Sequence, residues 1–259
     1  MHNAHAHRSH LLRTGIAVCV FLLIWIAVTW ANKAGLNFVN PLLLPSPMDV
    51  IDAAVDSIRS GELQVDIGAS LFRILAGFVI AAFAGIGLSL LVCMSKSAGF
   101  FIEPLFEILR PIPPLAFLPM LVLWFGIGEL SKVTFIAYSA FFPIFTASVD
   151  GVKHVDKLLL RAGASLGANK KQMFRYVVLP AATPFIFTGL KLGLSLSFFV
   201  IVAAEFLGAD SGLGYYINNA RTYFSVSQML LGAAIIGFFG YMVNLFLTMI
   251  ETRLLGWRD

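Results

Sequence analysis

An apolar stretch between residues 183 and 207 carries the side chains best placed to act on a solute. Six of them follow one another at intervals of three or four residues and therefore share one face of a helix: Thr188, Lys191, Ser195, Phe198, Val202 and Glu205. An ionisable group within a membrane faces the interior of a helix bundle, since a charge at the bilayer centre costs about 2.5 to 3.5 kcal/mol or more. We expect this face to line a path for a solute; helix packing within a dimer is the alternative.

A run of prolines marks a second place where a charged group could meet a solute. Arg110 lies directly before this run, which includes Pro113 and Pro114, and three residues after Glu107. Two interpretations of Arg110 stay open. It forms an intrahelical pair with Glu107, or it attracts an anionic sulfonate or carboxylate through charge-assisted hydrogen bonds in a water-filled cavity. The prolines predict a broken helix beside the path, with ordinary kinks facing lipid as the alternative.

The composition shows which solvent surrounds the elements that carry these groups. Of the 259 residues, 59% are hydrophobic and 12% are charged, and the mean hydropathy is +0.87. A soluble domain has about 25% charged and 45 to 50% apolar residues, so lipid must cover part of this chain. A soluble enzyme, a disordered regulator and a disulfide scaffold are excluded. The net charge of +4 forms no basic patch with interleaved aromatic residues, which argues against nucleic acid as a partner.

Six apolar segments are long enough to cross a bilayer, and they predict an all-α integral membrane fold. They run approximately over residues 11–31, 67–94, 100–125, 133–149, 183–207 and 228–250. The first segment could instead be a cleaved signal peptide, but it is long for one and lacks a small-residue cleavage site. We expect residues 1–10, with four of the five histidines, to form a disordered cytoplasmic tail, with metal binding as the alternative. Residues 11–259 then form a single transmembrane domain.

The basic residues in the loops predict the orientation of the chain. With the N-terminus placed inside, eleven of them face the cytoplasm: Arg8, Arg13, Lys96, Lys153, Lys157, Arg161, Lys170, Lys171, Arg175, Arg253 and Arg258. Four face the other side: Lys33, Arg59, Lys132 and Arg221. This distribution follows the positive-inside rule and predicts that both termini are cytoplasmic.

A cytoplasmic segment of about residues 150–180 reads as two short helices joined by a sharp turn. Asp156 can cap the first helix, and Gly167 can end it. Asn169 can cap the second, with Gln172 three residues later as in a capping box. Two uses of this segment stay open: a surface for a partner protein, or an interfacial helix resting on lipid.

Catalytic motifs are missing from the sequence. It contains no His-Glu-x-x-His zinc pattern and no Gly-x-Ser-x-Gly nucleophile turn, and His154 is the one histidine outside the tail. It also lacks a Gly-x-x-x-x-Gly-Lys-Ser/Thr phosphate loop, so the chain cannot supply an ATP site. We therefore expect no catalytic activity and no cofactor. An ion-coupled carrier or channel is the remaining alternative, although it would leave the cytoplasmic segment without a purpose.

The spacing within the cytoplasmic segment resembles a known signature. Arg161-Ala162-Gly163, three residues, Gly167, nine residues, and then Val177-x-Leu179-Pro180 is similar to the motif of permeases in ATP-binding-cassette importers. Arg161 replaces the usual Glu of that motif, and Gly163 replaces its second Ala. The resemblance implies that this coupling helix docks into the ATPase through seven residues: Arg161, Ala162, Gly163, Ser165, Leu166, Gly167 and Ala168.

Three further blocks resemble the subfamily that imports nitrate, bicarbonate, taurine and alkanesulfonates. They are residues 109–132, Val202-Ala203-Ala204-Glu205, and Gly212-Leu213-Gly214-Tyr215. Over about residues 42–253, the chain is most similar to taurine permeases. The resemblance implies a type I importer permease in the bacterial inner membrane that moves a small anion or zwitterion by alternating access. It also implies two copies of this chain, two ATPase subunits that hold ATP and Mg, and an extracytoplasmic solute-binding protein.

Two other polar groups have simple interpretations. Asn244, Thr248 and Glu251 share a face of the last span, where interhelical hydrogen bonds account for them. In the outer segment of about residues 32–66, a short helix carries Asp49, Asp52 and Asp56. These carboxylates either contact the binding protein or form a solvated face.

Overall fold

The computed structural model describes residues 2–36, 39–40 and 42–256, with side chains for 16–34, 39–40 and 42–256. Every regular element within these ranges is a helix. Contacts divide the chain into two units: Met1–Val65 with Tyr216–Ala234, and Asp66–Tyr215 with Ile235–Asp259. Three helices contribute residues to both units: α3 (Glu62–Met94), α10 (Leu213–Thr222) and α11 (Val226–Leu254).

The first unit contains α1 (His2–Ala31), a short π-helical turn η1 (Asn32–Leu36) and α2 (Pro47–Arg59). Polar side chains fix the connection between α1 and α2. The Asn32 amide exchanges two hydrogen bonds with the backbone of Val39, at 2.8 and 3.0 Å, and the Trp25 indole N–H donates to the Pro45 carbonyl at 3.1 Å. The Ser57 and Tyr216 hydroxyls, 2.8 Å apart, join α2 to α10.

The expected acidic helix of the outer segment is confirmed as α2. Its N-terminus is a capping box in which the Ser46 side chain accepts from the Asp49 N–H and the Asp49 carboxylate accepts from the Ser46 N–H at 2.7 Å. Asp49 also pairs with Lys33 at 3.1 Å. Asp52 and Asp56 are exposed, so the cap explains only the first of the three carboxylates.

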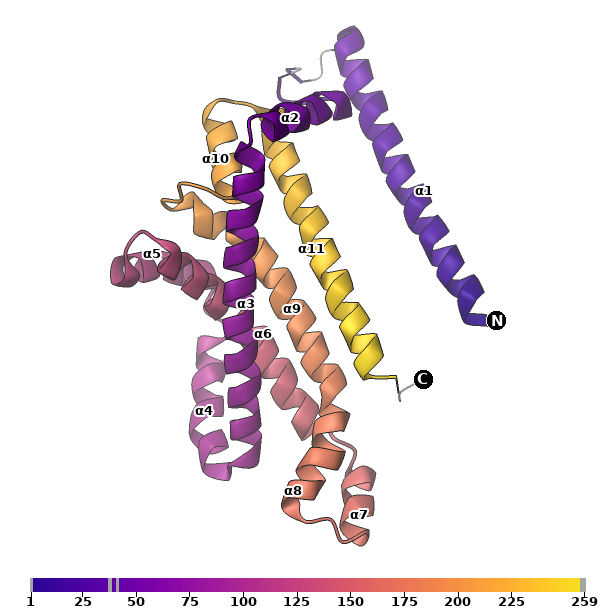
Figure 1. Ribbon diagram of the computed structural model, residues 1–259, viewed down its shortest axis with the longest axis vertical. Coiled ribbons are helices and arrows are strands. Elements are labelled where there is room, and N and C mark those ends of the chain that lie inside the picture. Colours follow the sequence, from indigo (N-terminus) through magenta and orange to yellow (C-terminus); the bar gives the residue numbers. More distant parts are fainter. Residues whose placement is uncertain (1, 37–38, 41, 257–259) are drawn as a thin grey trace. The chain divides into compact units, whose positions relative to one another are not determined.

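The second unit contains the apolar part of α3, α4 (Lys96–Leu109), α5 (Pro114–Phe125), α6 (Glu129–Lys153) and α9 (Leu179–Phe206). Glycines allow α6 and α9 to pack closely, side by side in Figure 1. A Cβ at Gly193 would lie 2.7 Å from the Ile144 side chain, and one at Gly151 would lie 2.6 Å from Phe185 Cβ. Small residues at a helix interface are typical of membrane proteins.

Helix α3 covers the same helix pair through a second set of close contacts. A Cβ at Gly77 would lie 2.7 Å from Ile136, and one at Gly85 would lie 3.0 Å from Ile144. The core of the unit includes Phe135, Ile201 and Leu194, all fully or almost fully buried. Three helices therefore form one closely packed group.

Within the part of the chain that the structure describes, five helices are long and apolar enough to cross a membrane, and α4 with α5 forms a sixth span if the bent pair is one crossing. The two halves of this pair meet at 101°. The break falls at the proline run, between Leu109 and Pro114, which confirms the predicted broken helix. The fifth span starts earlier than predicted, because α8 (Lys170–Met173), η2 (Phe174–Val178) and α9 follow one another without a break.

Candidate functional site: a coupling segment and a buried ionic network

The segment of about residues 150–180 forms the two predicted short helices. Helix α7 (Lys157–Ser165) is capped by Asp156, whose carboxylate accepts from the Leu158 N–H at 2.8 Å. Gly167 ends it with a φ of +78°, a conformation that favours glycine. Helix α8 starts at the predicted capping box of Asn169 and Gln172, with both hydrogen bonds at 2.9 Å. The caps and the turn are therefore confirmed.

Gly163 lets α7 lie close to the chain that returns to the membrane. This residue is buried, and a Cβ on it would lie 2.9 Å from Met173 Cε and 3.4 Å from Val177 Cγ2. The apolar side of α8 and η2 thus packs on α7. The replacement of the motif's usual second Ala by Gly163 suits this close approach.

Most of the predicted ATPase-coupling residues lie on the outer surface of this segment. Arg161, Ala162, Ser165, Leu166 and Gly167 are exposed, and Ala168 is half-buried. Leu166, at the turn, is 88% exposed. Packing within the chain does not explain an apolar side chain at such an exposed position. A contact with another protein would explain it.

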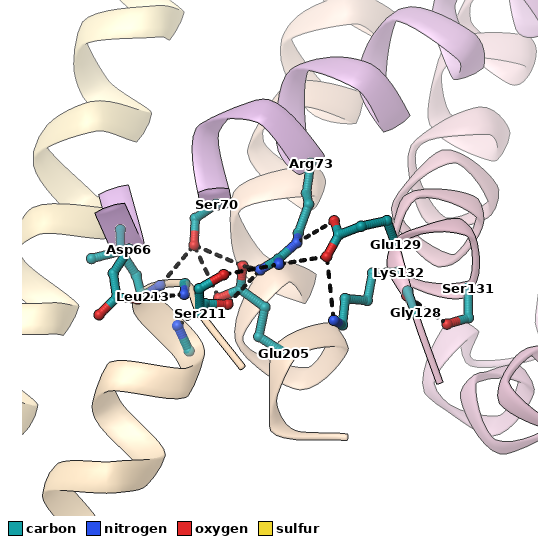
Figure 2. Close-up of polar contacts among 12 residues, drawn as sticks. Asp66, Ser70, Arg73, Gly128, Glu129, Ser131, Lys132, Glu205, Ser211 and Leu213 are labelled. Atoms are coloured by element: carbon teal, nitrogen blue, oxygen red, sulfur yellow. Dashed lines mark hydrogen bonds and ion pairs between the residues drawn. The ribbon is translucent and has the colours of Figure 1, made fainter. Parts of the chain in front are cut away.

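At the other end of α6 and α9 lies an ionic network that the sequence interpretation did not include (Figure 2). Arg73 of α3 is its centre, and its side chain is 4% exposed. Its guanidinium binds both oxygens of Glu129, at 2.6 and 2.7 Å, and Nη1 donates to Glu205 Oε1 at 2.7 Å. The Ser211 carbonyl and hydroxyl oxygens accept its remaining donors, at 2.6 and 3.4 Å. All five N–H donors of this arginine therefore have an acceptor.

Glu205 is fully enclosed by hydrogen-bond donors. Both of its oxygens lie within 2.9 Å of the Ser70 hydroxyl, and Oε2 also accepts from the Gly214 N–H at 2.7 Å. The side chain is 0% exposed. A buried carboxylate of this kind is stable only while its charge is paired and its oxygens are hydrogen-bonded.

The loop after α9 closes around this carboxylate (Figure 2). The Gly212 N–H donates to Asp66, and the Leu213 N–H donates to Ser70, both at 2.7 Å. Gly212 has a φ of +123°, and a Cβ on it would overlap the Glu205 carboxylate. A Cβ on Gly214 would lie 2.8 Å from Glu205 Cβ. Only glycines fit at these two positions.

The network joins sequence blocks that the resemblance had identified separately. Glu129 lies near the end of the proline-containing block, Glu205 ends Val202-Ala203-Ala204-Glu205, and Gly212 to Gly214 belong to the third block. Lys132 adds a longer contact to Glu129, at 3.5 Å. The sequence does contain a signal for Arg73, the partner of Glu205 that the sequence interpretation did not include. It is the single basic residue within the apolar segment of 28 residues, 67–94.

The predicted face of α9 is divided between two environments. Thr188 and Ser195 are exposed and Lys191 is 30% exposed, whereas Phe198 is 7% exposed and Glu205 is enclosed in the network. Lys191 pairs with Glu251 of α11, which confirms the predicted interhelical contact for Glu251. The Thr248 hydroxyl instead donates to the Asn244 carbonyl of its own helix, so the prediction was wrong for Thr248. Phe198 packs against Gly240 of the same helix, where a Cβ would lie 3.4 Å from its ring.

Arg110 lies at the break between α4 and α5 and is exposed. Among the described residues it forms no ion pair with Glu107, so the proposed intrahelical pair is not present. Pro113 and Pro114 lie at the start of α5, where a missing N–H leaves no hydrogen bond unmade. The guanidinium of Arg110 thus remains available to an external anion.

The structure is an all-helical unit with a broken span and a short helix pair between its two closely packed helices. Comparison with known proteins gives the family. Residues 77–256 match the family of binding-protein-dependent transport system inner membrane components, and the chain belongs to it. It is therefore the multi-pass inner-membrane permease of an importer. It is not itself catalytic, and ATP hydrolysis belongs to a partner ATPase.

Several curated relatives align over most of the chain. The taurine transport permease TauC of Escherichia coli is 34% identical, over 93% of this chain and 90% of its own. The putative aliphatic sulfonates permease SsuC of Bacillus subtilis is 33% identical, over 90% and 85%. The nitrate import permease NrtB of Synechocystis is 32% identical, over 93% and 88%. The expected subfamily is confirmed.

Solved structures share the fold at low sequence identity. A crystal structure of an amino acid ABC transporter with histidines gives a TM-score of 0.66 at 19% identity, covering 77% of this chain and 97% of that one. An inward-facing methionine ABC transporter gives 0.64 at 18%, covering 74% and 95%. The predicted type I importer permease fold is therefore confirmed.

Proposed function

We propose that this chain is the permease of an importer for a small sulfonate or amino sulfonate such as taurine. The support is the identity of 33 to 34% to taurine and sulfonate permeases, together with the exposed cationic group of Arg110. A guanidinium binds a sulfonate through two parallel charge-assisted hydrogen bonds. Nitrate is the second candidate, because one relative of similar identity imports it.

Family membership implies an ATPase, a solute-binding protein and a dimer as partners. In our proposal the importer contains two copies of this chain, two ATPase subunits that hold ATP and Mg, and one extracytoplasmic binding protein. Both termini face the cytoplasm, as the basic residues predict, and residues 11–259 form one transmembrane domain. Residues 2–10, which we expected to form a disordered tail, belong instead to α1. The exposed carboxylates of α2, Asp52 and Asp56, are then available to the binding protein.

One observation carries the proposed coupling mechanism: the segment with α7 and α8 connects two helices that pack on each other closely. Glycines bring α6 and α9 into contact, and Gly163 seats α7 against Met173. A displacement of α7 by the ATPase is therefore transmitted to both helices together. At their far ends the network of Arg73, Glu129 and Glu205 holds α6 and α9 to α3, about 36 Å along α6 from Lys153. The group moves as one block in alternating access.

We place the translocation path along the exposed part of α9 and at the break between α4 and α5. Thr188 and Ser195 are polar residues on the surface of an apolar helix, an arrangement that suits a water-filled path. Lys191 and Arg110 supply positive charge, and Pro113 and Pro114 shape the break. In this conformation Phe198 and Glu205 are buried, so they would reach a solute only if α9 separated from its neighbours.

The test is uptake by the reconstituted complex. Proteoliposomes with this permease, its ATPase and its binding protein receive taurine, ethanesulfonate, nitrate or bicarbonate, and ATP-dependent uptake is measured. We expect the binding protein loaded with taurine or ethanesulfonate to stimulate ATP hydrolysis and uptake. Stimulation by nitrate alone would overturn the solute assignment, and uptake without the ATPase would overturn the coupling mechanism.

Leu166→Asp tests the docking surface directly. A charge at an 88% exposed position does not disturb folding, but it removes an apolar contact with the ATPase. We expect co-purification of the ATPase to fall by about tenfold or more, since a central apolar anchor contributes about 1.4 kcal/mol or more. Lys157→Gln, an exposed change at the start of α7, is the matched control. Equal ATPase recovery from both variants would contradict this docking surface.

A further inference from the structure

The second unit contains a cavity, open to the surface, that the transport mechanism does not use; Lys96, Phe100 and Glu107 of its lining are exposed. It has a volume of about 690 Å³ and lies among the end of α3, the whole length of α4 and the last turn of α6. Two lysines and two glutamates line it, together with apolar residues and Cys93. The charged residues are Lys96, Glu103, Glu107 and Lys153.

These charges form one stripe along α4 with a partner from α6. Lys96, Glu103 and Glu107 are seven and four residues apart and therefore share a face of the helix. Lys153 of α6 pairs with Glu103 at 2.5 Å. Gly99, on the same face, lies close to the end of α3, where a Cβ would be 3.2 Å from the Val92 carbonyl. The cavity is thus built by close packing of the two helix ends.

The pairing within the cavity is incomplete. Among the described residues, neither Lys96 nor Glu107 forms a salt bridge, although both side chains line the cavity. Glu107 lies one helical turn beyond the paired Glu103, and Lys96 lies two turns before it. The lining therefore has a net charge of zero, with an excess carboxylate at one end and an excess ammonium at the other.

This distribution selects the chemical class of a ligand. A simple anion would leave Glu107 without a partner, and a metal cation would leave Lys96 without one. A small zwitterion satisfies both: its ammonium can bind Glu107 beside Glu103, and its acidic group can bind Lys153. Because Lys153 lies against Glu103, one helical turn, about 5.4 Å along α4, separates it from Glu107. This spacing is comparable to the separation of the charged groups in an amino sulfonate.

We propose that this cavity is a second binding site, for a small zwitterion on the cytoplasmic side, that regulates the coupling segment. Its position supports regulation because Lys153 is the last residue of α6 and Asp156 already caps α7. A ligand that draws Lys153 away from Glu103 changes the base of the coupling segment. The ligand is either a free amino sulfonate such as taurine or the headgroup of phosphatidylethanolamine, which also carries an anionic group beside an ammonium. The proposal does not depend on which solute is transported.

The test uses the permease in complex with its ATPase, in phosphatidylcholine vesicles with the ATPase side outward and without binding protein. Basal ATP hydrolysis is measured while taurine is added outside, and then ethanesulfonate or ethylamine, each of which carries only one of the two charges. We expect taurine to change hydrolysis at a concentration at least about tenfold lower than either single-charge compound, because both poles must be bound. A second set of vesicles contains phosphatidylethanolamine.

Variants and lipid composition decide the outcome. Glu107→Gln and Lys96→Gln alter residues without a salt bridge, so folding, checked by size-exclusion chromatography, is preserved; Glu62→Gln, exposed in the first turn of α3, is the matched control.

If free zwitterion is the ligand, the response to taurine weakens about tenfold in Glu107→Gln only. If the headgroup is the ligand, phosphatidylethanolamine alters hydrolysis in the unmodified permease but not in Glu107→Gln. Either result supports the site. No response to taurine or to phosphatidylethanolamine, or equal responses in all variants, would overturn it.

Discussion

Arg73 Nη1 and Glu205 Oε1 lie 2.7 Å apart in a place where neither side chain reaches solvent. The two residues come from α3 and α9 and are separated by 132 positions in the chain. Removing one partner of such a pair leaves an uncompensated buried charge, which costs about 3 to 5 kcal/mol. The pair therefore joins α3 to α9 through two residues of which neither can be lost alone without a large penalty.

The first prediction concerns this pair. Arg73→Met should lower the free energy of unfolding by about 3 to 5 kcal/mol, measured by thermal or denaturant unfolding in detergent, because Glu205 then stays buried without its cation. Glu205→Gln should also destabilise, and the double variant should lose less than the sum of the two. Glu129→Gln is the control: its side chain is 53% exposed, so the loss should be smaller. Additive losses would contradict a direct interaction.

Glycine at position 212 is the subject of the second prediction. Gly212→Ala adds a Cβ at a φ of +123° and places it on the Glu205 carboxylate, so the variant should lose about 1 to 3 kcal/mol of unfolding free energy. Gly87→Ala in α3 is the matched control, since its Cβ would meet open space. It should be neutral or slightly stabilising, because alanine favours a helix by about 0.5 to 1 kcal/mol over glycine. Similar unfolding of both variants would refute the proposed close fit.

The sequence predicted the helical caps well because their determinants are local. Asp156, Asn169 and Gln172 act on backbone groups within three residues, so the pattern of residue types is enough to place them. The spans were predicted for a similar reason, since hydropathy is a property of each segment alone. The fifth span was predicted to start near residue 183, whereas the helical run starts at Lys170. The run is continuous because no helix-ending signal lies between Met173 and Leu179, and Pro180 falls in the first turn of α9, where proline is tolerated.

The ionic network could not be predicted in the same way. Glu205 was identified as a charge within a span and assigned to the solute path, but its side-chain partners are 132 and 135 residues away, on α3. Only the fold brings Arg73 and Ser70 to it. A charge in a membrane helix predicts that a polar partner exists, and spacing within one helix does not show which residue it is. The path role of Glu205 stays a prediction, whereas its structural role follows from its contacts.

A third prediction concerns the contact between α7 and α8. Gly163→Leu should weaken ATP-dependent uptake strongly, because a large side chain cannot fit where a Cβ already lies 2.9 Å from Met173 Cε. Gly163→Ala should have a small effect, since the end of a methionine side chain can move aside. Met173→Ala combined with Gly163→Leu should restore part of the uptake by opening space. Failure of this second change to help would show that Gly163 acts through another contact.

The last prediction uses the pH dependence of the cap on α2. The hydrogen bond from the Ser46 N–H, followed by the Ser46 hydroxyl and Lys33, lowers the pKa of Asp49 below its ordinary value. Because the folded-state pKa is the lower one, the cap contributes stability above the unfolded value of about 3.9 and loses it as the pH falls through the folded value.

Asp49→Asn should therefore speed amide hydrogen exchange in the first turn of α2 at pH 7, and this difference should shrink as the pH falls below about 4. Asp52→Asn, an exposed change on the same helix, should leave that exchange rate unchanged at pH 7. If the Asp49→Asn difference were the same at pH 7 and at pH 3, the carboxylate charge would not be what stabilises the cap.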